Sequence, residues 1–324
     1  MPDILVLIIV LAVLFDIANG WHDCANAIAT VVSTKVLSPG TAVAIAAFMN
    51  ILGAFLTTAV AKTIGSGIVD PAAITDHVII AALLSAIIWN LITILMGLPV
   101  SSSHALVGGL IGAGAAHGGM SILNSAGIMK IFTSLLLSPI FGFIIGFGFM
   151  KLILYIFGHL APGTISKHFG RLQILSSSFM AFGHGSNDAQ KAMGIITMAL
   201  LAAGKINSLE VPKWVVLVCA LAMGFGTIFG GWKIIKTLGV KMLKLEPIHG
   251  FAAETSSAAI ILATSHFGMP VSTTHVVSTA ILGVGATKRL SAVRWGIAGK
   301  IVMAWVLTLP FCIALAWGIV RLLD

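Results

Sequence analysis

The sequence predicts an all-α integral membrane protein with about ten membrane segments, which include broken helices and hairpins arranged as two inverted-topology repeats. Of the 324 residues, 58% are hydrophobic and only 9% are charged, and the mean hydropathy is +1.09. A soluble domain carries about 25% charged residues. The apolar runs are continuous rather than alternating, which is typical of membrane-spanning helices and not of a β-barrel.

The charge and cysteine content argue against several other classes. The net charge of +8 does not indicate a nucleic-acid-binding protein, because several basic residues sit in short connections, where cytoplasmic loops concentrate lysine and arginine. The three cysteines lie in apolar runs without metal-type spacing, so we expect no disulfide framework. The hydrophilic stretches are too short to form a soluble domain.

The first half of the chain contains four apolar runs and one short return segment. The run over 3–34 begins with a span that we expect to be retained, because Asp3 precedes the apolar residues 4–17 in place of the basic region of a signal peptide and no A-x-A cleavage pattern directly follows them. Spans are expected at 41–61, 78–98 and 128–160, and a return segment runs from 98 to 117. Residues 161–172 form a polar linker.

The pattern then restarts, with apolar runs at 173–203, 211–235, 249–268 and 295–320. Three motifs occur in the same order in both halves: the segments 20–27 and 185–192, the Lys-Thr-X-Gly segments 62–65 and 236–239, and the Pro-Val-Ser segments 99–104 and 270–275. This indicates a tandem duplication, typical of secondary transporters. We expect a first repeat at 1–160, a cytoplasmic linker at 161–172 and a second repeat at 173–324.

Loop charges predict that the two repeats have opposite orientations. The loop over 63–77 is acidic and the loop over 118–127 is neutral, whereas their counterparts after Lys236 and at 288–294 are basic. Equivalent loops of opposite bias should lie on opposite sides of the membrane. The linker is then inside and both termini are outside.

The repeated Pro-Val-Ser segments predict an anion site. Proline favours the first turn of a helix, and serine or threonine caps its free N–H groups, which together with the helix dipole attract anions. Two such helix starts should face one anion, held by six hydroxyl residues: Ser101, Ser102, Ser103, Ser272, Thr273 and Thr274. For His104 and His275, which follow the hydroxyls, we favour structural hydrogen bonding over contact with the anion.

The segments around Asp23 and Asp188 predict a cation site. A carboxylate at bilayer depth usually faces a cavity, a cation or a partner, although a position near the membrane interface is the alternative. With Gly20 and Gly185 as helix breakers, unwound carbonyls would bind a cation together with Asp23, Asn26, Asn187 and Asp188.

Three further residues have open interpretations. His22 is a proton carrier, a metal ligand or a hydrogen-bonded buried histidine. Lys191 offsets Asp188, contacts the anion or extends its ammonium group to the interface. Glu254, in the run before the second Pro-Val-Ser segment, is a candidate for cation coupling.

The motifs Gly-Trp-His-Asp-Cys-Ala-Asn-Ala at 20–27 and Gly-Ser-Asn-Asp-Ala-Gln-Lys-Ala at 185–192, with the two Pro-Val-Ser segments, resemble the duplicated signature of the PiT inorganic phosphate transporters. The resemblance implies a dimeric inverted-repeat carrier in the plasma or inner membrane that moves phosphate with a cation. It implies that the hydroxyl residues hold phosphate and the Asn-Asp segments hold the coupling ion. The Gly-Trp-His-Asp form is more similar to bacterial low-affinity members, which are proton-coupled and take up metal–phosphate complexes.

We therefore expect a multi-pass phosphate symporter, not an enzyme, with inorganic phosphate, a coupling cation and the lipid bilayer as its partners and no permanently bound cofactor. The coupling ion is H⁺ or Na⁺, and a divalent metal is carried if the substrate is a metal–phosphate complex. Alternatives are sodium-coupled transport of phosphate or sulfate, an intramembrane Ser/His/Asp hydrolase, and an anion channel. The duplicated runs of hydroxyls fit shared ligation better than a single nucleophile–base site.

Overall fold

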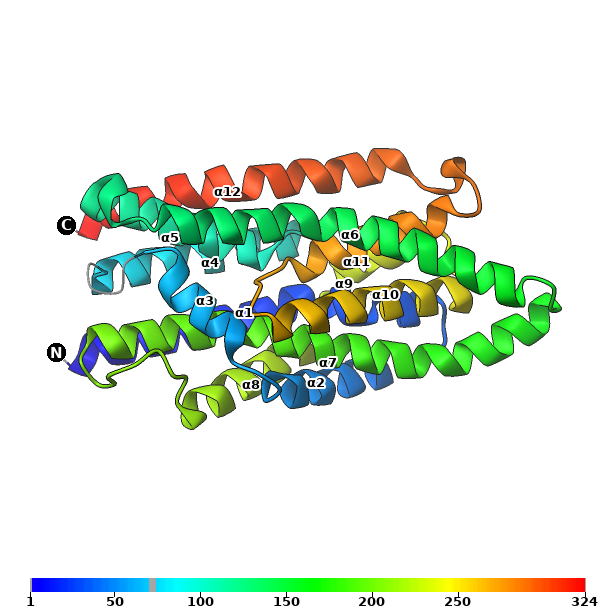
Figure 1. Ribbon diagram of the computed structural model, residues 1–324, viewed down its shortest axis with the longest axis horizontal. Helices are drawn as coiled ribbons and strands as arrows, with labels where there is room; N and C mark the ends of the chain where they lie inside the picture. The colour runs from blue at the N-terminus through cyan, green and yellow to red at the C-terminus, as the bar shows by residue number, and fades with distance from the viewer. Residues whose placement is uncertain (1, 70–73, 324) are drawn as a thin grey trace.

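The computed structural model describes residues 2–69 and 74–323, and within them it is a bundle of long helices (Figure 1). The helices are α1 (Pro2–Ser33), α2 (Pro39–Ala54), α3 (Ala59–Gly67), α4 (Asp76–Met96), α5 (Ser102–Gly118), η1 (Gly119–Ile122), α6 (Ser125–Phe157), α7 (Pro162–Ala202), α8 (Lys213–Ile228), α9 (Trp232–Lys236), η2 (Thr237–Lys241), α10 (Pro247–His266), α11 (Thr273–Ala286), η3 (Leu290–Ala292) and α12 (Trp295–Leu323). Among the described residues, β structure is limited to an isolated bridge between Val69 and Leu123. The all-α prediction is confirmed.

Within residues 2–69 and 74–323, five helical segments are long and apolar enough to cross a membrane: most of α1, α4, α5 together with η1, α6 and α12. The number rises to seven if each of two bent pairs is one span. These pairs are α2 with α3, bent by 71°, and α8 with α9 and η2, bent by 63°. The expected number of about ten membrane segments stays a prediction.

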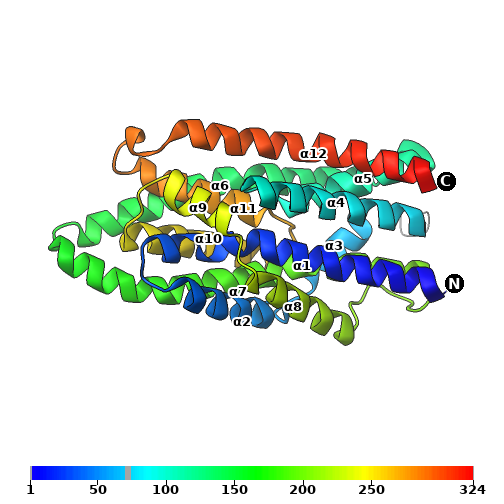
Figure 2. The ribbon, with the colours of Figure 1, turned by 180° about the vertical axis from the view of Figure 1, so that it is seen from behind.

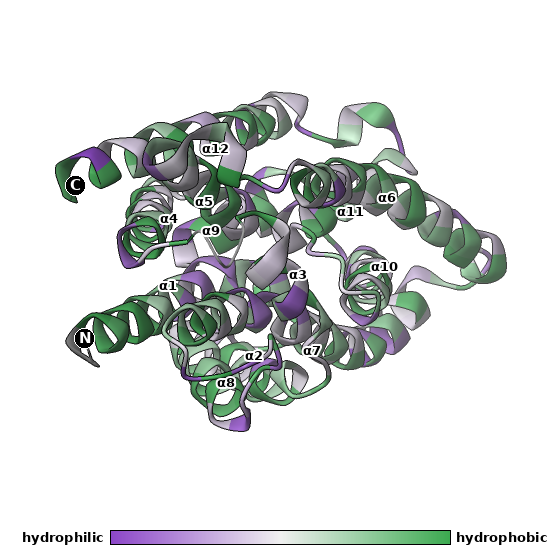
Figure 3. Ribbon diagram, turned by 60° about the vertical axis from the view of Figure 1, so that its left-hand side comes forward, coloured by the Kyte–Doolittle hydropathy of each residue, from purple (hydrophilic) through white to green (hydrophobic). Residues whose placement is uncertain are grey.

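The chain ends and connections divide between two ends of the bundle. Figures 1 and 2 agree that both termini lie at one end of the long axis, together with the α5–α6 connection. The α6–α7 and α11–α12 connections lie at the opposite end. Figure 3 shows hydrophobic residues along much of the outer helices, with hydrophilic residues near the centre of the bundle and in the connections.

The helix breaks predicted at Gly20 and Gly185 are wrong. The helices α1 and α7 continue without interruption through the segments that contain Gly20 and Gly185. Both glycines serve close packing, because a Cβ at Gly20 would meet the carbonyl of Met223 and one at Gly185 the carbonyl of Asn50. The unwound carbonyls expected beside Asp23 and Asp188 are therefore hydrogen-bonded within helices.

The breaks lie elsewhere. The spans predicted over 41–61 and 211–235 are each two short helices joined at a sharp bend. The linker predicted over 161–172 is also helical, since α7 begins at Pro162, and the chain reverses between α6 and α7 over residues 158–161. Proline at the first position of a helix needs no N–H partner, so the reversal can be this short.

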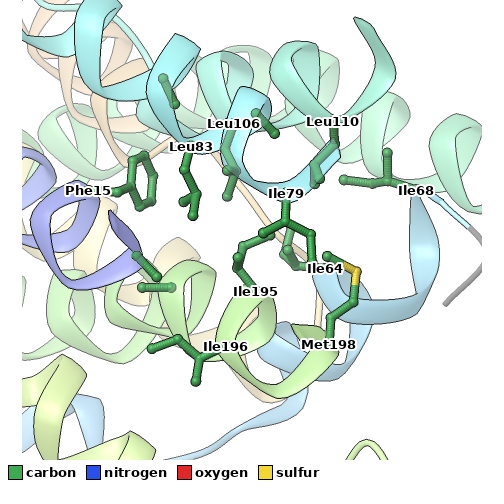
Figure 4. Packing of buried hydrophobic residues seen from close by; sticks show 14 of the residues in the cluster. Phe15, Ile64, Ile68, Ile79, Leu83, Leu106, Leu110, Ile195, Ile196 and Met198 are labelled. Carbon is green, nitrogen blue, oxygen red and sulfur yellow. The ribbon is translucent and has the colours of Figure 1, made fainter. Parts of the chain in front are cut away.

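Apolar residues form two buried clusters. Figure 4 shows part of the first, where Phe15 of α1, Leu83 of α4, Leu106 of α5 and Ile195 of α7 gather. The second cluster joins the later part of α1 to α10 and α11. The polar residues of the predicted site lie on the same helices.

Helices from the two halves of the chain pack against each other in matched pairs. Helix α1 packs on α8 while α2 packs on α7, and α5 packs on α12 while α6 packs on α11. Glycines allow these close approaches: a Cβ at Gly112 would lie 2.7 Å from the Cα of Ile313, and one at Gly146 would lie 2.9 Å from the Cα of Ala280.

Two hydrogen bonds also cross between the halves in matching fashion. Thr63 of α3 donates through Oγ1 to the carbonyl of Gly268 at 2.7 Å, and Thr237 of η2 donates to the carbonyl of Gly97 at 2.9 Å. Each half therefore holds the turn that precedes the Pro-Val-Ser segment of the other half. We call these two bonds the tip clasps.

Candidate functional site

The two Pro-Val-Ser segments form the tips of helical hairpins, one between α4 and α5 and one between α10 and α11. Each hairpin turns at a left-handed glycine, Gly97 with φ of 70° and Gly268 with φ of 64°. At the start of the next helix, the hydroxyl of Ser101 accepts a hydrogen bond from the N–H of His104, and Ser272 does the same for His275, both at 3.2 Å. The predicted serine caps are confirmed.

The two hairpin tips meet inside the bundle. Ser103 Oγ donates to the carbonyl of Val271 at 3.0 Å. The rings of His104 and His275 lie 4.7 Å apart between centroids. All six predicted hydroxyl residues are buried, and the structure brings them together from opposite halves of the chain.

The hydroxyls of the tips contact the carboxylates of α1 and α7. Thr274 donates to Asp23 Oδ1 at 3.2 Å, and Ser102 donates to Asp23 Oδ2 at 3.3 Å. Thr273 donates to Asp188 Oδ2 at 3.0 Å. Residues of the predicted anion set and of the predicted cation set therefore contact each other in one polar cluster. Asn26 belongs to it too, because its Nδ2 donates to Thr274 at 2.9 Å.

His22 links Asp23 to the first hairpin tip. The Nε2 of His22 lies 3.2 Å from the carbonyl of Leu98. The Nδ1 lies 2.6 Å from Asp23 Oδ1. The imidazole and the carboxylate are therefore close enough to exchange a proton.

On α7, Asp188 is held by two basic side chains. Lys191 Nζ lies 3.0 Å from Oδ1 and His184 Nε2 lies 3.2 Å from Oδ2. The side chain of Lys191 is only 1% exposed. Of the three interpretations of Lys191, the structure therefore agrees with the balancing of the Asp188 charge and not with extension of the ammonium group to the membrane interface. One ligand atom each from Asp23, His184 and Asp188 lies within 4.8 Å of the others, close enough to share a cation.

The orientation of His184 is set by two residues from both halves of the chain. Thr227 Oγ1 donates to the carbonyl of Met223 at 2.8 Å, so it accepts the hydrogen bond from Asn50 Nδ2 at 2.8 Å. The amide oxygen of Asn50 then faces His184 Nδ1 at 3.0 Å, and this nitrogen must donate. The other nitrogen, Nε2, therefore needs a second proton or a cation to face Asp188 favourably.

Two predicted residues lie outside this cluster of contacts. Asn187 donates to Ser265 Oγ at 3.0 Å. Glu254 accepts hydrogen bonds from Gln173 at 3.0 Å, from Thr30 and from Ser176, all buried or partly buried. Glu254 still connects to the cluster through α1, because Thr30 lies one helical turn beyond Asn26.

The structural hydrogen bonding expected for the rings of His104 and His275 is not found at three of their four nitrogens in the described structure. Within the described residues, Nδ1 of His104 and both ring nitrogens of His275 have no hydrogen-bond partner. His275 stacks on Trp305 with 3.8 Å between centroids. The two rings line an apolar groove of about 780 Å³ between α6 and α12. Their contribution is packing between the hairpin tips.

Sequence reasoning did not group His184, Asn50 and Thr227 into the site. Their spacing carries no signal, since α7, α2 and α8 bring them together from distant parts of the chain. The duplicated position of the Asn-Asp segments was the only indication that α7 faces α1.

Comparison with known proteins gives concordant results. A family model described as "Phosphate transporter family" matches residues 19–316. A Bacillus subtilis protein described as "Probable low-affinity inorganic phosphate transporter" is 50% identical over 94% of this chain and 92% of its own length. A Rhizobium meliloti protein with the same description is 48% identical over 95% of this chain and 92% of its own length. A solved structure described as "The sodium-dependent phosphate transporter" matches with a TM-score of 0.93 and 27% identity, covering 99% of both chains.

Proposed function

Because the chain belongs to the phosphate transporter family, we propose that it is a symporter that carries inorganic phosphate across the cell membrane together with a proton. The observation that carries the proposal is the contact of both hairpin tips with the buried carboxylate of Asp23, and of the second tip with that of Asp188 as well. An anion bound at the tips is then directly sensitive to the protonation state of the carboxylates, which is what coupling requires.

The hydroxyls of the two tips are the proposed phosphate ligands: Ser101, Ser102, Ser103, Ser272, Thr273 and Thr274. Singly and doubly charged phosphate keep at least one O–H, whereas sulfate has none. A site that contains the carboxylates of Asp23 and Asp188 beside the hydroxyls can accept the hydrogen bond that phosphate donates. Sulfate has no hydrogen to donate, so in this site it would face the two carboxylates without a hydrogen bond. The site therefore disfavours sulfate.

The short contact between His22 and Asp23 supports the proton as the coupling ion, because an imidazole beside a carboxylate can take up and release a proton. When phosphate accepts the hydroxyl groups that now donate to Asp23, the carboxylate loses two hydrogen bonds and becomes available to a cation. The second cation position, between His184 and Asp188, takes a proton or a metal ion. A metal ion bound there would be cargo, carried with phosphate as a complex.

We propose that transport uses two inverted repeats, 1–160 and 173–324, with about ten membrane segments. The matched packing of α5 with α12 and α6 with α11, and the two tip clasps, support this relation. Alternating access would follow if one set of helices moves relative to the other around the tips. Assembly as a homodimer, which the family resemblance implies, stays a prediction.

Loop charge supports the proposed orientation. The connections at the end opposite the termini include 34–38, 242–246 and 287–294, where Arg294 N–H donates to the carbonyl of Met242. They carry the basic residues Lys35, Lys244, Lys288, Arg289 and Arg294 and one acid, Glu246. The connection over 203–212, at the end with the termini, carries Lys205 and Glu210. The more basic end is proposed to be cytoplasmic, and the turn between α6 and α7 with it.

Uptake of labelled phosphate into proteoliposomes tests the function. We expect an imposed proton gradient to drive accumulation above the external concentration, and sulfate not to compete. Accumulation driven by a sodium gradient alone would favour the sodium-coupled alternative, which similarity to a sodium-dependent phosphate transporter makes the second candidate. Phosphate flux that never exceeds equilibrium would indicate a channel. A magnesium arm, with and without metal on the phosphate side, tests the metal–phosphate complex as substrate.

A further inference from the structure

Helix α1 carries a line of buried polar residues that extends beyond the cluster described above. Asp16, Asn19, Asp23, Asn26 and Thr30 follow one another at alternating spacings of three and four residues. Residues at these spacings lie on one face of a helix. None of the five is more than 2% exposed. This face leads from the central cluster toward the end of the bundle that holds the termini (Figure 2).

Asp16 is the first member of this line; its carboxylate makes no hydrogen bond of normal geometry among the described residues, and the donor that acts on it is the side-chain amide of Asn19. Both amide atoms of Asn19, one turn further along, are also without a hydrogen bond of normal geometry there, as are those of Asn90 on α4, which packs on α1. Buried polar groups in native proteins are rarely unpaired. A bare carboxylate at bilayer depth is unfavourable unless it is neutralised.

The ionisable groups that act on Asp16 from neighbouring helices are Lys191 and Asp188 on α7 and the thiol of Cys219 on α8. Lys191 already pairs with Asp188 at 3.0 Å. Helix α4 has ionisable side chains only at its first two residues, Asp76 and His77, and α2 has none. The contacts of α10 and α11 with α1 fall further along the helix, where Thr30 meets Glu254 and Asn26 meets Thr274. Lys191 is therefore the nearby cation, and it is already engaged.

We propose that Asp16 carries the coupling proton between the His22–Asp23 pair and the end of the protein that holds the termini, with Asn19 orienting a bridging water. The proposal rests on the proposed function. Asp16 lies seven residues before Asp23, about 10 Å along the helix axis at 1.5 Å per residue. That distance is too long for direct transfer and suits passage by way of water bound at the Asn19 amide.

The transfer conserves atoms and charge. The O–H bond of the Asp16 carboxyl group breaks and leaves a carboxylate, while the bridging water accepts this proton and releases another to the His22–Asp23 pair. A second proton from the aqueous side then restores the Asp16 carboxyl group. The resting carboxyl group is neutral, which agrees with its burial and with the engagement of Lys191, the nearby cation, by Asp188.

The test compares Asp16→Asn, which has the same shape but carries no proton, with Asp16→Glu, which keeps the carboxyl group. Ser85→Ala, a buried substitution on α4 away from the line, is the matched control. Each purified variant is placed in proteoliposomes. Two rates are measured: accumulation of labelled phosphate driven by a proton gradient, and exchange of labelled for unlabelled phosphate without any gradient. Exchange needs binding and carrier movement but no net proton transfer.

We expect Asp16→Asn to lose accumulation by on the order of 100-fold, as when a positioned proton-transfer group is removed. Its exchange rate should stay near that of the wild type, and Asp16→Glu should restore accumulation. The infrared spectrum of the wild type should contain a protonated-carboxyl C=O band that is missing from Asp16→Asn. The spectrum reports on Asp16 even if the variant transports poorly.

Three results would overturn the proposal: normal accumulation in Asp16→Asn, loss of exchange together with accumulation in the folded variant, or identical infrared spectra. A fourth result would also overturn the proposal: a sodium gradient drives accumulation in the wild type but not in Asp16→Asn. The site would then bind a metal cation rather than a proton. Failure of the wild type to exchange phosphate at all would instead remove the proposed function, an outcome that the exchange arm identifies separately.

Discussion

Thr274, at the tip of the second hairpin, donates a hydrogen bond to Asp23 of the first helix at 3.2 Å. The two residues belong to different halves of the chain and are 251 positions apart. Their contact joins a proposed phosphate ligand to a proposed carrier of the coupling cation. Four sets of substitutions probe this junction and the elements that support it.

Replacement of Thr273 and Thr274 by valine removes two hydroxyls that face Asp188 and Asp23. Hydrogen bonds to charged groups contribute about 1.5–3 kcal/mol each. We expect the apparent KM for phosphate to rise at least about tenfold in proteoliposome uptake assays. Replacement of both residues by serine keeps the hydroxyls and is the matched control. An unchanged KM in the valine variant would remove both residues from the phosphate site.

Replacement of Asp188 by asparagine leaves the buried ammonium group of Lys191 without its carboxylate partner. Breaking one side of a buried ion pair costs about 3–5 kcal/mol. We expect the variant to fold, to unfold at a lower temperature in detergent, and to lose proton-driven phosphate uptake.

The double variant Asp188→Asn with Lys191→Met separates these two effects. It should recover part of the thermal stability because the unpaired charge is gone, while uptake stays absent. Recovery of uptake in the double variant would mean that Asp188 serves only to balance Lys191.

Replacement of Thr227 by valine removes the acceptor of the Asn50 side-chain amide. The amide group can then rotate by 180°, so that its oxygen no longer holds the hydrogen on Nδ1 of His184 in place. We expect turnover to fall by about tenfold with KM for phosphate unchanged, since the histidine acts on the coupling step. The effect should vanish when His184 is already alanine, because both changes act through the same ring. Additive losses in the double variant would contradict this relation.

Three glycine-to-alanine variants separate backbone strain from crowding. Gly97 and Gly204 have nearly equal positive φ, 70° and 65°, but a Cβ at Gly97 would lie 2.9 Å from the Cβ of Lys233, while one at Gly204 meets no described atom within 4 Å. Left-handed backbone costs an alanine about 1–2 kcal/mol. Gly204→Ala should lower the unfolding temperature slightly, and Gly97→Ala should lower it more.

Gly148→Ala supplies the baseline for this series, because Gly148 is helical and a Cβ there meets no described atom within 4 Å. Equal effects of Gly97→Ala and Gly204→Ala would show that the contact between the tip and α9 carries no stability.

The sequence was sufficient to predict the meeting of the hairpin tips, because the Pro-Val-Ser segments repeat with their proline, hydroxyls and histidine in register. The caps at Ser101 and Ser272 followed from local backbone chemistry, which neighbouring residues determine. These features depend on short stretches of chain and are therefore accessible to pattern reasoning.

The predictions failed where a residue had two physical roles. Glycine weakens a helix, but it also admits a neighbouring backbone, and at Gly20 and Gly185 the second role prevails. The bends after α2 and α8 lie inside runs that read as uniform spans. The setting of His184 by Asn50 and Thr227 depends on packing between distant helices, which spacing along the chain does not encode.

The tip clasps make each half of the chain dependent on the other. The carbonyl of Gly97 is satisfied by Thr237 and that of Gly268 by Thr63, so a half-length chain would expose an unpaired acceptor in the hydrocarbon interior. We therefore expect that a separated half does not fold into a stable carrier on its own. Division of the polypeptide at the short reversal between α6 and α7 should be tolerated only when both fragments are made in the same membrane.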